Sequence, residues 1–235
     1  MTKRIERAYG KVLSGTLKVI NPIKKKVKKT ECEVHLGIQH NALDILVNNN
    51  YNKEYRLFSK YIANINRGLV WADQDFKCYH HFYNPYQNKG KYGYEKNAMI
   101  LARSYYDKAI KFYMIGNHEK SMFYFGASCH LIQDLTVPQH AKGRLFDGHK
   151  QFETYVKRNY KDVARFKSIG VPIILSDIKS YADYNAIYAI KVDNMYRNVP
   201  DNTTRYYLTA SKCLILAQDT TAGLMITFYK DLQNI

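Results

Sequence analysis

The chain of 235 residues has no apolar run that approaches the roughly 18 residues needed to cross a membrane. Its N-terminus is basic but lacks the apolar stretch of a secretory signal. As written, the sequence therefore predicts an unexported protein, cytoplasmic or peripheral to a membrane. Its four cysteines include no CxxC pair and require no disulfide framework. We expect Cys129 and Cys213, which stand in apolar helical stretches, to be small core residues.

Acidic residues are also scarce, with 20 Asp+Glu against 36 Lys+Arg and a net charge of +16. A surface this basic attracts nucleic acid, anionic lipid or another phosphate-rich partner. The most basic stretch is residues 1–30. It is either a helix lying on an anionic membrane or a solvated basic arm, and Gly10 and Gly15 favour the arm. We expect residues 31–235 to form one monomeric domain.

Helical periodicity dominates from Val34 onward, and the prolines fall between the periodic segments, where they end helices. Residues 171–175 form a short apolar run that resembles a strand but has no evident partner. The sequence predicts an all-α fold, a single-domain bundle of about seven to nine helices. The expected helices are 33–48, 53–72, 94–115, 118–135, 149–160, 181–196 and 203–232.

Two histidine–carboxylate pairs share the helical i, i+4 spacing that puts both side chains on one face: His130 with Asp134, and His149 with Glu153. Such a pair is usually a weak surface interaction, and a lone histidine is usually an ordinary packed residue, as we expect for His40 and His118. Here, however, both pairs and His140, just past the end of the first helix, fall within 24 residues.

Histidine and carboxylate ligands without thiolate suit a catalytic zinc site, where one position stays open for water. Asp134 has two oxygens and follows His130 by one turn, so it is placed to bridge two metals. Clusters of this kind carry out phosphoryl chemistry, in which one metal generates hydroxide and its neighbours bind the phosphate oxygens. Asp73 and His81 flank a tyrosine-rich loop and are further candidates.

In order and spacing these residues resemble the bacterial zinc-dependent phospholipase C family, over about residues 33–233. The single-strand nucleases of fungi and plants share that fold and are more distant. The most specific stretch runs from Phe123 through HLIQD (130–134) and PQHA (138–141) to HKQFE (149–153). Further support comes from EVHL (33–36), WAD (71–73), HFYNP (81–85) and AQDTTAG (217–223).

The resemblance implies that the residue at each matching position is a metal ligand. Asp73 is also implied as the general base that orients the attacking water. His81 fits the motif better than His80, because Phe-Tyr-Asn-Pro follows it directly. The first zinc would be held by Asp73, His81, His130 and Asp134, the second by His140, His149 and Glu153, and a third by Asp134 and His35.

The chain departs from the family at the third metal, which is completed there by the amino group and carbonyl of an N-terminal tryptophan. Here the only tryptophan is Trp71, and none precedes His35. Two zinc ions are therefore expected. The third is absent, weakly held or completed by another group.

The resemblance implies a phospholipase C that cleaves the glycerol–phosphate bond of a phospholipid. Glu153 favours this reading, since the nuclease branch usually has aspartate there. Tyrosines between Tyr79 and Tyr94 either cage a quaternary ammonium head group or simply pack. The alternatives are a single-strand nuclease, which the basic surface would suit, and a non-catalytic lipid- or nucleic-acid-binding relative.

Overall fold

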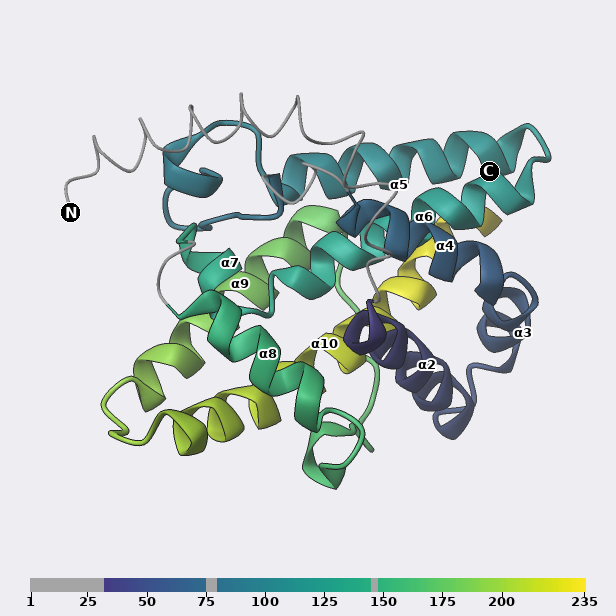
Figure 1. Ribbon diagram of the computed structural model, residues 1–235. Coiled ribbons are helices and arrows are strands. Elements are labelled where there is room, and N and C mark those ends of the chain that lie inside the picture. The colour runs from purple at the N-terminus through teal and green to yellow at the C-terminus, as the bar shows by residue number, and fades with distance from the viewer. Residues whose placement is uncertain (1–31, 75–79, 145–147) are drawn as a thin grey trace.

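The computed structural model describes residues 32–74, 80–144 and 148–235 (Figure 1). The basic N-terminal segment, whose two interpretations were left open, lies outside these residues. The described part consists of nine α-helices and two short 3-10 turns and contains no β-strand, which confirms the all-α class. The helices are α2 (Glu33–Asn48), α3 (Asn52–Lys60), α4 (Ile62–Asp73), α5 (Ala98–Met114), α6 (His118–Asp134), α7 (Pro138–Lys142), α8 (His149–Asn159), α9 (Ile178–Tyr196) and α10 (Asn202–Gln233).

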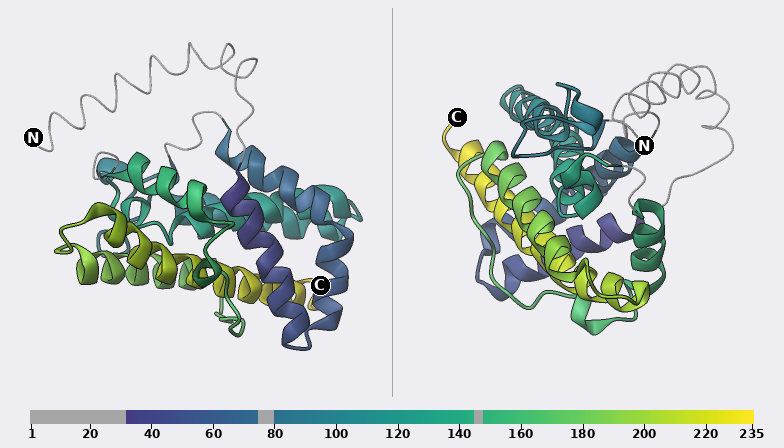
Figure 2. Two further views of the ribbon diagram at one scale, coloured as in Figure 1. Left: turned by 60° about the horizontal axis from the view of Figure 1, so that its bottom comes forward. Right: turned by 90° about the vertical axis from the view of Figure 1, so that its left-hand side faces the viewer.

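Helix α6 is the centre of the molecule and packs between α4 and α5. From Phe125 to its last residue, Asp134, every residue of α6 is buried. On the other side, α9 and α10 form an antiparallel pair, and α10 also contacts α2 (Figure 2). Phe125 of α6 stacks on Phe58 of α3 and Phe228 of α10, with ring centroids 5.3 and 4.3 Å apart. Aromatic stacking in the core thus joins the two sides.

The contact between α4 and α6 depends on two glycines that bring the backbones together. A Cβ atom at Gly68 would lie 1.7 Å from the carbonyl oxygen of Phe123. A Cβ atom at Gly126 would lie 2.0 Å from the carbonyl oxygen of Ile65. Neither position has room for a side chain, so the two glycines set the distance between the helices that carry Asp73 and His130.

The structure corrects two of the expected helices. The helix expected over 53–72 is two helices, α3 and α4, which break at Tyr61 (φ −109°, ψ 16°). Neither glycine nor proline marks this break in the sequence. The helix expected from residue 94 begins at Ala98, because Asn97 caps it by accepting a hydrogen bond from the Ile100 amide.

Residues 171–175 form no strand. The amide of Ile173 instead donates to the carbonyl of Asp219, which ties this segment to α10. None of the helices in the described part of the chain is both long and apolar enough to cross a membrane.

Candidate metal centre

The ends of several helices meet at one place and bring the chemistry-bearing residues together. The first turn of α2, the last turns of α4 and α6, the short helix α7 and the first turn of α8 all face this point. The eight residues selected from the sequence all lie here: His35, Asp73, His81, His130, Asp134, His140, His149 and Glu153.

Asp134 is at the centre of this cluster and has a side chain that is only 5% exposed. Its Oδ2 lies 2.7 Å from Nδ1 of His81 and 3.2 Å from Nε2 of His130. Its Oδ1 lies 3.3 Å from Nε2 of His35. The i, i+4 spacing of His130 and Asp134 therefore places both side chains inward, where residues from two other elements join them.

A second group is formed by His140, His149 and Glu153. The Nε2 atoms of the two histidines are 2.7 Å apart, and Oε1 of Glu153 is 2.8 Å from His149 and 3.5 Å from His140. The Nδ1 atom of His140 lies 3.8 Å from Oδ2 of Asp134, which connects this group to the first.

Helix α7, which the sequence interpretation missed, positions His140. It begins with Pro138, whose missing N–H is no loss at a first helical position. His140 was expected just past the end of the helix that carries His130, and it does lie there, inside this additional short helix. Its ring stacks on Phe82 at 4.6 Å, and its Nδ1 donates to the backbone carbonyl of His81 at 2.9 Å. This hydrogen bond leaves Nε2 free to face His149.

A hydrogen bond to a neighbouring side chain orients His35 in a similar way. Its Nδ1 lies 2.9 Å from Oε1 of Gln133, so the ring donates there and turns Nε2 toward Asp134. The amide nitrogen of Gln133 lies 3.3 Å from the hydroxyl of Thr221 on α10 and 3.4 Å from Oε1 of Gln39. An amide that supports a ligand histidine in this way selects its tautomer.

The carboxylates and histidines of the cluster shift one another's pKa values. Burial raises the pKa of Asp134, but the neighbouring His130 and His140 outweigh burial and hold that pKa well below its ordinary value. Partial burial opposes ionisation of Glu153, whose side chain is half exposed, yet hydrogen bonds from His140 and His149 lower its pKa to about 2. Burial lowers the pKa of His140, but Asp134 and Glu153 outweigh it and raise the pKa to about 9. Protons on the histidines thus offset the charges of the two carboxylates.

The arrangement fits metal ions better than it fits protons alone. Oδ2 of Asp134 is buried and makes no hydrogen bond of good geometry, although ring nitrogens surround it. Pairs of ring nitrogens also face each other, at 3.3 Å for His81 and His130 and at 2.7 Å for His140 and His149. Three groups have ligand atoms within 4.8 Å of one another: His35, His130 and Asp134; Asp73, His81 and His130; and His140, His149 and Glu153. A nitrogen and oxygen donor set of this kind suits zinc.

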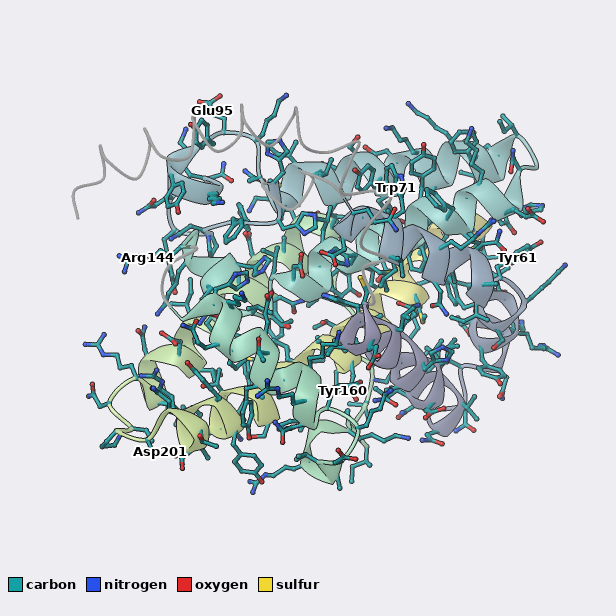
Figure 3. All side chains as sticks on the ribbon, viewed as in Figure 1. Tyr61, Trp71, Glu95, Arg144, Tyr160 and Asp201 are labelled. Carbon is teal, nitrogen blue, oxygen red and sulfur yellow. The ribbon has the colours of Figure 1, made fainter. Side chains whose placement is uncertain are left out.

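Other histidines and aromatic residues lie outside these three groups. His40 is exposed, and His118 packs on the rings of Tyr61 and Tyr113. Trp71 of α4, labelled in Figure 3, is partly buried and packs against the rings of Tyr105, Phe123 and Tyr124.

The tyrosines between Tyr79 and Tyr94 differ in their burial and contacts. Tyr83 is buried, and its hydroxyl donates to Asp183 at 2.6 Å. Tyr86 is 66% exposed. Tyr83 is thus a core residue whose hydroxyl already has a hydrogen-bond partner. Tyr79 lies outside the described residues.

Two residues at the centre did not stand out in the sequence. Gln133 lies inside the HLIQD run, but only its contact with His35 reveals its role. Cys32 precedes α2, and its Sγ donates to Oδ2 of Asp73 at 3.0 Å. The nearness of Cys32 to His35 in sequence was a usable signal. The contact of Cys32 with Asp73 could not be inferred from the sequence, because 41 residues separate the two.

A helical fold with three histidine–carboxylate groups next to a buried aspartate has the ligand types of metal-dependent enzymes that carry out phosphoryl chemistry. The family model of the zinc dependent phospholipase C matches residues 34–212. The chain belongs to this zinc-dependent family.

Two curated proteins named phospholipase C, both from Bacillus cereus, are each 28% identical to the chain over 144 residues. The match covers 54% of this chain and 51% of the relatives, so the chain spans about half the length of the curated relatives it matches.

Among solved structures, the alpha-toxin of Clostridium absonum has a TM-score of 0.74 at 21% identity. The alpha-toxin of an avian strain of Clostridium perfringens has a TM-score of 0.73 at 19% identity. Each comparison covers 88% of this chain and 65% of the other. At these identities the two likenesses show the fold.

Proposed function

We propose that this protein is a zinc-dependent phospholipase C that hydrolyses the glycerol–phosphate bond of a phospholipid. The observation that carries the proposal is the convergence of three histidine–carboxylate groups on buried Asp134 in a member of this family. The named activity of the Bacillus cereus relatives supports the same reaction class.

The proposed ligand sets follow the geometry. One zinc is assigned to Asp73, His81, His130 and Asp134, and a second to His140, His149 and Glu153. His35 and Asp134 are the two ligands proposed for a third metal position. Zinc bound in such sets supplies Lewis acidity toward water and toward phosphate oxygens.

Asp73 is the residue we assign as general base. Its side chain is 30% exposed, against 5% for Asp134, so water and substrate can reach it. Its Oδ1 lies 4.0 Å from Nε2 of His130, which places it at the edge of the cluster instead of its centre. A carboxylate in this position can orient a water molecule and accept its proton.

The deeper carboxylate has a different role. Asp134 contacts histidines from three directions and is shielded from solvent, so it holds the ligands together and keeps its negative charge. Glu153 on α8 has a half-exposed side chain, so solvent reaches it as it reaches Asp73. We therefore propose that the substrate phosphate approaches between Asp73 and Glu153.

The proposed partner is a phospholipid, reached in a membrane by a monomeric protein whose net charge of +16 favours an anionic surface. The test offers zinc-loaded protein phosphatidylcholine vesicles and single-stranded DNA in parallel. Release of phosphocholine that a chelator abolishes supports the proposal. Release of nucleotides alone would replace it with the nuclease alternative.

Two variants make this test specific. His130→Ala removes a ligand that contacts both Asp134 and His81, so it should lose zinc and activity together. His118→Ala is the matched control, because His118 packs on Tyr61 and Tyr113 outside the three groups. If His130→Ala kept full zinc and full turnover, the ligand assignment would be wrong.

A further inference from the structure

Cys32 occupies the N-cap position of α2 but does not act as a cap. A capping side chain normally accepts a hydrogen bond from a backbone amide in the first turn, and serine, threonine, aspartate or asparagine do this best. The side chain of Cys32 makes no such bond. Its Sγ lies instead 3.0 Å from Oδ2 of Asp73, at the end of α4.

The position of this thiol suits a ligand of the metal centre. Cys32 is 5% exposed and precedes His35 by less than one helical turn, so the start of α2 delivers both residues to the cluster. Zinc ligands lie ~2.0–2.3 Å from the ion, so two atoms that share one ion are at most about 4.5 Å apart. The Sγ of Cys32 and Oδ2 of Asp73 are well within this limit.

A second observation, independent of the cysteine, points to a cation at this place. Oδ2 of Asp134 is buried and makes no hydrogen bond of good geometry, although histidine nitrogens surround it. Burial and the charges of Asp73 and Asp134 raise the pKa of the Cys32 thiol, so the sulfur keeps its proton until a cation offsets those charges. A buried thiol beside two carboxylates gains little from its weak S–H hydrogen bond, whereas a thiolate beside zinc is a strong ligand.

We propose that Cys32 is a thiolate ligand of the zinc ion that Asp73 binds. This inference rests on the zinc centre of the proposed function and adds a residue type that the histidine–carboxylate pattern did not include. On metal binding the S–H bond breaks, the proton leaves to solvent and the sulfur binds zinc through the electron pair it retains. Asp73 then contacts the ion and no longer accepts from the thiol.

The test replaces zinc by cobalt in the full-length chain, since a thiolate bound to cobalt absorbs in the near ultraviolet through sulfur-to-metal charge transfer. Wild-type protein is stripped with a chelator, titrated with cobalt and compared with Cys32→Ala and Cys32→Ser. Cys213→Ala is the matched control, because Cys213 is a buried cysteine of α10. Cys78→Ala tests the cysteine that lies outside the described residues.

We expect the charge-transfer band in wild-type protein, in Cys213→Ala and in Cys78→Ala, and its loss in both Cys32 variants. We also expect one cobalt ion to bind at least about tenfold more weakly in both Cys32 variants. Serine keeps a hydrogen-bond donor for Asp73 but offers no thiolate. Full cobalt affinity in Cys32→Ser would therefore show that Cys32 only positions Asp73, and would overturn the inference.

Failure of the inference is distinguishable from failure of the metal centre. Cobalt bound by the wild-type protein without a charge-transfer band would overturn the thiolate ligand and leave the histidine–carboxylate centre in place. A band lost in Cys78→Ala and kept in Cys32→Ala would also overturn it. No cobalt bound at all would refute the metal centre on which the proposed function stands.

Discussion

Replacing Gly126 with alanine tests how the packing of α4 on α6 supports the metal centre. The added Cβ would lie 2.0 Å from the carbonyl oxygen of Ile65, where real contacts are not shorter than 3.0 Å. The helices must therefore separate by about 1 Å, and overpacking of this kind costs roughly 3 kcal/mol. In a chain of this size that cost lowers the melting temperature by about 6–12 °C.

The same displacement should reach the site. Asp73 ends α4 and His130 lies one turn beyond Gly126 on α6, with Oδ1 and Nε2 4.0 Å apart. Moving α4 outward takes Asp73 away from His130. We expect weaker zinc binding at the group that contains Asp73 and normal binding at His140, His149 and Glu153, which lie on α7 and α8.

The assay combines thermal unfolding with the number of zinc ions retained after dialysis. Gly116→Ala is the control, because Gly116 has φ +76° but no atom within 4 Å of an added Cβ. It should cost about 1 kcal/mol through backbone strain and leave zinc binding unchanged. If Gly126→Ala melted within a degree of wild type and kept all its zinc, the close approach of the helices would be wrong.

Three further outcomes follow from the site. Asp73→Asn should keep the metal bound at His140, His149 and Glu153 yet cut turnover by about 10²–10⁴-fold, and unchanged turnover would remove Asp73 from the role of base. His130→Ala should lose more zinc than His35→Ala, because His130 belongs to two of the three groups and His35 to one; equal loss by elemental analysis would contradict this. Burial raises the pKa of Asp219, so its ionised form destabilises the folded protein above that pKa, and the penalty disappears as the pH falls toward about 4. Asp219→Asn should therefore raise the melting temperature at pH 7 but not near pH 4, and the same difference at both would refute the argument.

Much of the fold was readable from local pattern. The ranges 33–48, 118–135 and 149–160 match α2, α6 and α8 to within a residue at each end, because apolar periodicity is a local property of the sequence. The break at Tyr61 was not readable. No glycine or proline stands there, and the periodic pattern continues across Tyr61 from α3 into α4.

The candidate site was found because its residues are of unusual types at telling spacings. The pairs His130 with Asp134 and His149 with Glu153 can be recognised from their i, i+4 spacing alone. Placing Asp73 and His35 required the family resemblance, since long stretches of chain separate them from the other ligands. For Cys32 the only sequence signal was its nearness to His35, because no second cysteine stands close to it in the chain.

By itself the sequence determined the helices, their class and the ligand types, since periodicity and i, i+4 geometry are properties of neighbouring residues. Only the tertiary structure decided that the ends of α2, α4 and α6 meet, that His35 lies against Gln133, and that the thiol of Cys32 lies against Asp73. These contacts join residues 41 to 98 positions apart. Their existence depends on how closely the helices pack, which in this protein rests on glycines such as Gly68 and Gly126.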